Sequence, residues 1–115
     1  MMRPYEVVLP NQGDGGMIAG VVSADFSLSR SFPDPFDGHT SISYSVPFDQ
    51  HVQLRVYNSL GQEVKTLVNQ SVKSGSHRAT WDATDNSGAR VAAGTYFYKM
   101  ASKAGIHTQR TTLLK

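Results

Sequence analysis

Side chains able to perform catalysis are few in this chain and lie far apart in the sequence. The four histidines fall in different segments, and none lies in a helical metal-binding motif or beside a nucleophile elbow. They are His39, His51, His77 and His107. The absence of cysteine excludes disulfides, thiolate zinc sites and thiol nucleophiles. The spacing of residues in the sequence does not exclude a Ser–His–Asp triad, because a triad is an arrangement in space. Most serines, however, occupy outward strand or turn positions. The sequence therefore predicts a protein that is not an enzyme.

The densest group of oxygen ligands lies in the segment 82–90 (DATDNSGAR). Asp82, Asp85 and Asn86 offer carboxylate and amide oxygens, which are the ligands that calcium prefers. Their spacing differs from that of an EF-hand loop, and no bidentate glutamate follows at the required distance. Asp, Asn, Ser and Gly also stabilise turns by bonding to their own backbone. The sequence therefore favours a structural turn with no cofactor, and calcium binding is the alternative.

Aromatic side chains offer a third kind of chemistry, because exposed rings can bind carbohydrate. Alternation along the predicted strands assigns Tyr44, Tyr96 and Tyr98 to the interior. Trp81 ends a strand just before the long loop, where a large ring can close the core. Phe97 has the opposite phase and is the aromatic residue predicted to make an external contact. A carbohydrate-binding accessory module is therefore one alternative function.

Composition bounds the remaining classes of function. The 115 residues have the length of one domain, and 39% hydrophobic with 17% charged residues suits a folded core with a solvated surface. The net charge is +2 and the cations are scattered, so no nucleic-acid partner is expected. No segment approaches the roughly 20 apolar residues of a membrane helix. No small-molecule substrate is expected either.

Two-residue alternation runs through the chain after residue 25. Val52, Leu54 and Val56, for example, face one way while Gln53 and Arg55 face the other. The segment 63–68 continues the pattern, with Val64, Thr66 and Val68 as the inward set. Turn residues separate the alternating segments, as in Asn58-Ser59-Leu60-Gly61. The predicted strands are 26–28, 40–47, 51–57, 63–68, 77–81, 95–101 and 106–114.

This pattern predicts an all-β protein, an immunoglobulin-like antiparallel β-sandwich of about seven strands that spans residues 25–115. Residues 1–24 contain several glycines and little periodicity. They are predicted to form a linker or an irregular lead-in, with Glu6–Leu9 as the best candidate strand.

The stretch from Phe26 to Lys115 also carries landmarks in a characteristic order. They are the blocks FSLSRSFPDPFDGHTSISYSVP, VQLRVYNSLGQEVKTLV and GSHRATWDATDNSGARVAAGTYFYKM, followed by a strand that ends in TTLLK. With these landmarks the chain resembles the C-terminal sorting domain of type IX secretion cargo and the related immunoglobulin-like domain of the flagellar hook-capping protein. Asp34 and Asp37 stand where that family usually has asparagine, which keeps the turn propensity and adds charge.

Two of the landmarks make structural predictions of their own. In the block Phe32–Phe36, the two prolines fix φ and both phenylalanines are expected to plug the end of the sandwich. Gly94 precedes Tyr96, and its missing side chain is expected to let the backbone pass close to the loop 82–90.

The resemblance implies two functional branches. In the sorting branch, a non-catalytic module directs an attached exported protein through the type IX secretion system. Its partners are then secretion-machinery proteins and an N-terminal cargo domain, and its location is secreted or at the bacterial cell surface, reached through the periplasm. In the flagellar branch, the domain is structural and helps hook subunits to assemble. The sandwich runs to Lys115, as in sorting domains, which favours the sorting branch.

By the same resemblance, the recognised surface includes the last two strands and the chain end. Its residues are Gly94, Tyr96, Thr111, Thr112, Leu113, Leu114 and Lys115. A terminal strand can add to a partner's sheet through backbone hydrogen bonds. The alternative is a plain edge strand that its last lysine protects from aggregation.

Overall fold

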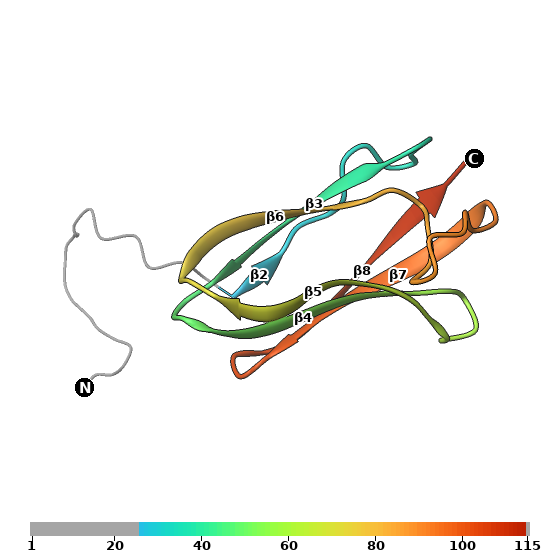
Figure 1. The fold of residues 1–115 in the computed structure, drawn as a ribbon. Helices are drawn as coiled ribbons and strands as arrows, with labels where there is room; N and C mark the ends of the chain where they lie inside the picture. Colours follow the sequence, from blue (N-terminus) through green and yellow to red (C-terminus); the bar gives the residue numbers. More distant parts are fainter. Residues whose placement is uncertain (1–25, 115) are drawn as a thin grey trace, which may run out of the picture.

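Residues 26–114 form two β-sheets that pack face to face (Figure 1). The computed structural model describes these residues, and the predicted lead-in 1–24, Asp25 and Lys115 lie outside them. The three-stranded sheet has the order β2 (Ser27–Leu28), β3 (Thr40–Val46), β6 (Gly75–Trp81). The four-stranded sheet has the order β5 (Glu63–Val72), β4 (Gln50–Tyr57), β7 (Gly94–Ser102), β8 (Gly105–Leu113).

The pairings between these strands are all antiparallel, which confirms the predicted all-β sandwich of seven strands. The described part of the chain contains no helix that is long and apolar enough to cross a membrane.

The core lies between the two sheets and follows the alternation of each strand. In β4, Val52, Leu54 and Val56 are fully buried, whereas Gln53 and Arg55 are only partly covered. Complete burial of one such side chain is worth about 1.5–3 kcal/mol, so this shared apolar layer is the main source of stability. The core residues are Leu28, Phe36, Ile42, Tyr44, Val46, Val52, Leu54, Val56, Val72, Trp81, Ala83, Tyr96, Tyr98, Met100 and Leu113.

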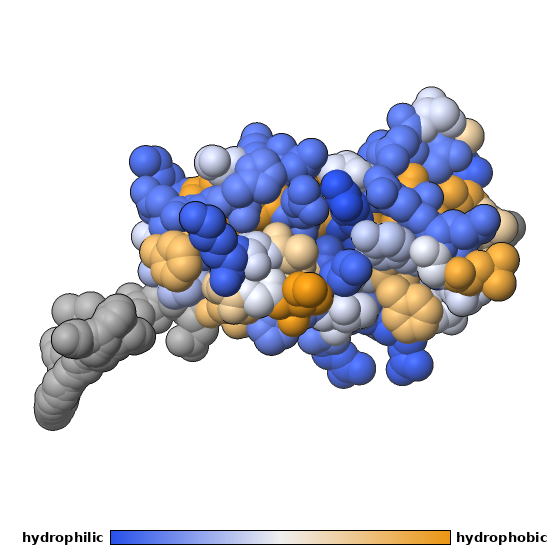
Figure 2. All heavy atoms as spheres, turned by 90° about the horizontal axis from the view of Figure 1, so that it is seen from below, coloured by the Kyte–Doolittle hydropathy of each residue, from blue (hydrophilic) through white to orange (hydrophobic). Residues whose placement is uncertain are grey.

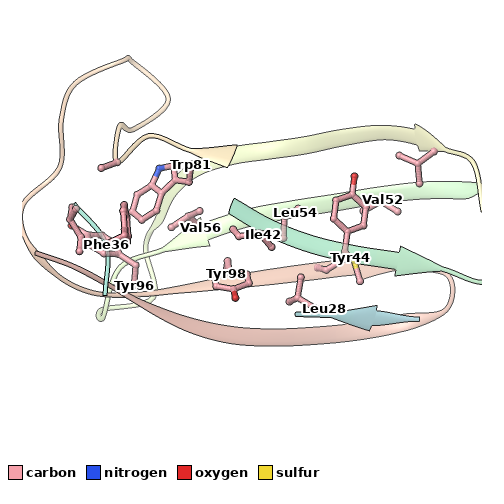
Figure 3. Packing of buried hydrophobic residues seen from close by; sticks show 14 of the residues in the cluster. Leu28, Phe36, Ile42, Tyr44, Val52, Leu54, Val56, Trp81, Tyr96 and Tyr98 are labelled. Carbon is pink, nitrogen blue, oxygen red and sulfur yellow. The ribbon is translucent and has the colours of Figure 1, made fainter. Parts of the chain in front are cut away.

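Three aromatic rings meet at one end of this core (Figure 3). The ring centroid of Trp81 lies 5.6 Å from that of Phe36 and 5.1 Å from that of Tyr96. The rings are tilted or edge-on to each other, as the charge distribution of aromatic rings favours. Trp81 Nε1 also donates a hydrogen bond to the carbonyl oxygen of Thr84 at 2.9 Å. The predicted position of Trp81 at the end of the core is confirmed.

Phe32 corrects one prediction about this end of the sandwich. Its side chain is 80% exposed, whereas Phe36 is 1% exposed, so only the second phenylalanine plugs the core. The backbone of Phe32 pairs with Ser41 in an antiparallel bridge. Residues directly opposite each other point to the same face, and Ser41 has the outward phase of β3. The ring of Phe32 is therefore directed outward.

Strand β5 departs from simple alternation. The register between β4 and β5 shifts twice, and Thr66 consequently lies opposite Arg55 on the outer face. Alternation predicts an inward Thr66, which is wrong because each bulge inserts an extra residue and reverses the phase. On the outer face, Thr66 Oγ1 donates a hydrogen bond to Glu63 Oε2 at 2.8 Å. The strand also continues to Val72, beyond its predicted end at Val68.

Candidate interaction surface

The predicted recognition residues divide into a buried set and an exposed set. Tyr96, Thr111 and Leu113 are 6%, 0% and 1% exposed, and their side chains face the core. In the folded domain the side chains of these three residues are not accessible to a partner, so they support recognition only by stabilising the fold. The more accessible set is Gly94, Thr112 and Leu114, and Lys115 lies outside the described residues. A direct recognition role for the accessible residues stays a prediction.

Tyr96 has a structural task that alternation does not reveal. Its hydroxyl donates a hydrogen bond to the carbonyl oxygen of Ala92 at 2.6 Å, and its ring packs edge-on against Trp81. Burial raises the pKa of this hydroxyl, which keeps it protonated as a donor. A tyrosine that bonds back to the backbone a few residues upstream is the tyrosine corner of immunoglobulin-like sandwiches. A tyrosine at the start of a strand, just after a long loop, is the signal for this feature.

Gly94 is needed for its backbone angle and not for a close approach. The prediction that the loop 82–90 passes too near for a side chain is wrong, since an added Cβ would meet no atom within 4 Å. The φ of Gly94 is +149°, a value that residues with side chains rarely adopt. Gly94 therefore sets the direction in which the chain enters β7.

The C-terminal end of β8 is already hydrogen-bonded on the side away from β7. Phe36 donates its N–H to the carbonyl oxygen of Thr112 at 2.9 Å, and Leu114 donates to that of Phe36 at 2.9 Å. The N–H of Thr112 donates to Asp34 Oδ1 at 3.0 Å. A partner strand predicted to add at Thr111–Lys115 would have to displace these bonds. The end of the strand is thus closed by the segment around Phe36.

The outer face of the four-stranded sheet carries an aromatic and cationic row. Tyr57 lies opposite Phe97, which lies opposite Arg110. Lys99 Nζ sits 5.3 Å from the ring centroid of Tyr57 in a cation–π contact. Phe97 is half-buried and lies outside the core, as its phase predicts. The four-stranded sheet is the lower sheet in Figure 1, and Figure 2 shows the molecule from below. On this surface the hydrophobic side chains form small, separate groups among hydrophilic ones.

A groove of about 560 Å³ adjoins this row. Its lining includes Arg30, Asp34, Thr95, Phe97, Thr108 and Arg110. A second hollow of about 370 Å³ lies beside Tyr57 and shares Phe97 and Thr108 with the first. The two hollows therefore adjoin each other at Phe97 and Thr108 and lie as a depression over β7 and β8.

The side-chain oxygens of loop 82–90 accept hydrogen bonds from the protein itself. Asp85 Oδ1 accepts from the N–H groups of Ser87 and Ala89 at 2.9 and 3.0 Å and from Ser87 Oγ at 2.6 Å. Asn86 Oδ1 accepts from the N–H of Thr66 at 3.0 Å and so ties the loop to β5. Asp82 Oδ1 accepts from the backbone and hydroxyl of Thr84. Within residues 26–114, no three His, Asp or Glu side chains group as metal ligands would.

Replacing Asp85 with alanine is expected to loosen this loop and lower the melting temperature. Hydrogen bonds, first of all from the Ser87 hydroxyl, hold the pKa of Asp85 below its usual value. Stability from a lowered pKa is present above the unfolded-state pKa of about 3.9 and is lost as the pH falls through the folded-state value. The gap in melting temperature between wild type and Asp85→Ala should therefore shrink between pH 7 and strongly acidic pH. Asp85→Asn, which keeps an acceptor oxygen, is the control, and a gap independent of pH would contradict this account.

Three of the four histidines have structural partners in the described chain. His51 Nε2 lies 2.7 Å from Asn69 Oδ1, His77 Nε2 lies 2.6 Å from the carbonyl oxygen of Lys73, and His107 Nε2 lies 3.0 Å from that of Phe26. These contacts join neighbouring segments of the sandwich. The remaining one, His39, is exposed.

Comparison with known proteins places this sandwich in a family. The family model described as the FlgD Ig-like domain matches residues 31–105, which is more than half of the chain. The chain belongs to this family. The FlgD Ig-like match spans β3 to β7 and ends at Gly105, the first residue of β8. A comparison with curated proteins found no significant match.

Solved structures share the fold of this FlgD Ig-like domain. FlgD from P. aeruginosa is 20% identical with a TM-score of 0.54, covering 69% of this chain and 70% of that one. FlgD from Xanthomonas campestris, whose structure is described as giving insights into the hook capping essential for flagellar assembly, is 23% identical with a TM-score of 0.54. That match covers 79% of this chain and 67% of that one. At these identities the likeness establishes the fold.

A third solved structure is similar over a small part of its length. PorZ of Porphyromonas gingivalis is described as an essential surface component of the type-IX secretion system. It is 15% identical with a TM-score of 0.52 over 79% of this chain, and the match spans 12% of the PorZ chain. The sandwich of the FlgD Ig-like domain thus recurs as one part of a much longer protein.

Proposed function

We propose that this chain is a non-catalytic assembly domain that binds a structural protein subunit. The observation that carries the proposal is the FlgD Ig-like match over residues 31–105. The site geometry supports it, because the outer face of β7 and β8 offers an aromatic and cationic depression to a partner. The carboxylates of loop 82–90 are engaged in turns, which supports a scaffold role for them.

The test is complex formation by the purified full chain. Size-exclusion chromatography with light scattering would compare the chain alone, the chain mixed with purified flagellar hook subunit, and the chain mixed with lysozyme as an unrelated basic protein. We expect co-elution with the hook subunit, or self-association of the chain, and no complex with lysozyme. A chain that stays monomeric and binds no hook subunit at high micromolar concentration would contradict the assembly function.

Sorting through the type IX secretion system is the second candidate function. The ordered landmarks from Phe26 to Lys115 and the fold shared with a part of PorZ favour it. In that case the domain directs an attached cargo through the periplasm to the cell surface or the medium. Residues 25–115 fused to a reporter with a Sec signal should then reach the medium of a type IX-competent host. A fusion retained in the periplasm would eliminate this candidate.

A further inference from the structure

The edge of β8 that faces away from β7 is hydrogen-bonded to the segment around Phe36 at its C-terminal end. Along the rest of the described strand this edge is open. Phe36 and Asp34 occupy the backbone groups of Thr112 on the side away from β7. Backbone groups alternate sides along a strand, and β7 and β8 pair without a register shift. The N–H and C=O groups of Thr108 and Arg110 therefore also point away from β7. Among residues 26–114, these groups have no hydrogen-bond partner.

The groove of about 560 Å³ lies alongside this open edge. It is lined by Thr108 and Arg110, whose side chains face out, and by Gln109, whose side chain faces in, so it wraps around the edge of the strand. Arg30 lines the opposite wall. An unpaired strand edge beside an open groove is the geometry used when a partner peptide adds a strand to a sheet.

The opposite wall is held in place by contacts from β8 itself. Gln109 Nε2 donates to the carbonyl oxygen of Leu28 at 3.1 Å, and Ser31 Oγ donates to Thr111 Oγ1 at 2.8 Å in a buried bond. These bonds fix the segment that carries Arg30 beside the edge. The groove is therefore formed before a partner arrives, which reduces the entropy lost on binding.

The charges around the groove select an acidic partner. Arg30 and Arg110 are exposed on its two sides, and Lys99 lies on the neighbouring strand. Asp34 is the one carboxylate among the lining residues, and its Oδ1 accepts the N–H of Thr112, so the two arginines outnumber the acidic side chains of the groove. Carboxylates on a bound strand would meet these free guanidinium groups in charge-assisted hydrogen bonds.

The other sheet edges fit such a partner less well. The start of the β5 edge is occupied by the loop 82–90, because Asn86 donates its N–H to the carbonyl oxygen of Val64 at 3.0 Å and its side chain accepts the N–H of Thr66. The later part of β5 lines the same groove as β6. The β6 edge borders a groove of about 490 Å³ in which Arg78 is the single lysine or arginine among the lining residues. The β8 edge thus combines open backbone groups with two arginines, Arg30 and Arg110, whereas the β6 groove has one.

We propose that the β8 edge from Ile106 to Arg110 binds an extended acidic segment of a partner protein as an added β-strand. This inference rests on the proposed assembly function and names the place and the chemistry of partner binding. The segment around Phe36 pairs with β8 at Thr112 and Leu114, and the added strand pairs with the preceding part of the same edge. Its backbone pairs with Thr108 and Arg110, and its acidic side chains face Arg30 and Arg110.

The probe is a short acetylated peptide that alternates threonine with glutamate, titrated into the isotope-labelled full chain and followed by NMR. The amide signals of Ile106, Thr108 and Arg110 should shift in a saturable way and gain protection from hydrogen exchange. A peptide that alternates threonine with lysine should bind at least about tenfold more weakly, since one unfavourable charge contact of 1.4 kcal/mol suffices for that factor. Shifts that centre on β6 would overturn the proposal.

Two variants test the edge directly. Arg110→Glu should weaken peptide binding at least about tenfold, whereas Arg78→Glu on the exposed side of β6 should leave it unchanged. Thr108→Pro removes one outward N–H without removing a bond to β7 and should also weaken binding. Circular dichroism checks that each variant is folded. Wild-type binding by both Arg110→Glu and Thr108→Pro would refute the inference.

The hook-subunit experiment separates this inference from the proposed function. Hook-subunit binding that Arg110→Glu does not weaken would uphold the assembly function and overturn the β8 edge as its site. Peptide binding at the β8 edge by a chain that binds no hook subunit would uphold the edge and overturn the assembly function.

Discussion

Replacing Trp81 with alanine should destabilise the domain by about 3–5 kcal/mol, the range observed when large buried aromatic residues are truncated. Trp81 is fully buried, contacts the rings of Phe36 and Tyr96, and donates a hydrogen bond to the carbonyl oxygen of Thr84. A domain of this size has about 5–15 kcal/mol in total, so the loss approaches the whole stability at the lower end. Urea denaturation followed by circular dichroism measures the change.

Phe32→Ala provides a matched control for this prediction. It also truncates an aromatic residue, but one that is 80% exposed, so its effect should stay within about 0.5 kcal/mol. Trp81→Phe should fall between the two, because it keeps an aromatic ring and loses the bond to Thr84. Equal urea midpoints for Trp81→Ala and Phe32→Ala would show that the aromatic cluster is not the closed end of the core.

Deleting residues 111–115 should abolish cooperative unfolding altogether. Truncation of a buried leucine alone costs about 2–5 kcal/mol, and Leu113 is 1% exposed. The deletion also removes Thr111, the buried hydroxyl partner of Ser31, and the strand that Phe36 pairs with. Thermal unfolding followed by near-ultraviolet circular dichroism should show no transition.

The point variant Leu114→Ala is the control for this deletion. Leu114 is 56% exposed, so its truncation should cost no more than about 0.5 kcal/mol. A sharp transition in the deletion variant would show that the end of β8 is dispensable for the fold. With the expected result, any loss of export or binding on deletion reflects unfolding, and recognition has to be tested by point variants of accessible residues such as Thr112 and Leu114.

The sequence predicts the core well because a strand's own alternation carries the information. Val52, Leu54 and Val56 alternate with polar residues, and all three are fully buried. Tyr96 and Trp81 are also buried as predicted. The turn at Asn58–Gly61 follows from local chemistry in the same way, with the N–H of Gly61 donating to the carbonyl oxygen of Asn58 at 3.0 Å.

The errors arise where a distant segment or an inserted residue decides the outcome. The outward phase of Phe32 depends on its pairing with Ser41, and the outward phase of Thr66 depends on bulges against β4. Neither event leaves a mark in the local pattern, because a bulge changes the register without changing the composition. The two-residue alternation of the amino-acid sequence therefore identifies the strands more reliably than it identifies the face on which each side chain lies.

The candidate surface was predictable in part for the same reason. The phase of Phe97 predicts its outward position, which needs only its own strand. Asp34 and Phe36 close the end of β8. Asp34 and Thr112 are 78 positions apart in the sequence, and the spacing of residues does not predict a contact over that distance. The extent of the open edge likewise depends on where this distant segment stops pairing with β8.

The parallel contact between Phe36 and Leu113 has a mechanical consequence. The first described residues and the C-terminal end of β8 lie at opposite ends of the sandwich (Figure 1). Tension between residues 26 and 114 would slide the two segments past each other, so the bonds that cross between them are loaded in shear. Bonds loaded in shear have to break together, and bonds at the end of a hairpin break one at a time. Tension applied between these two points would therefore be resisted by all of these bonds together.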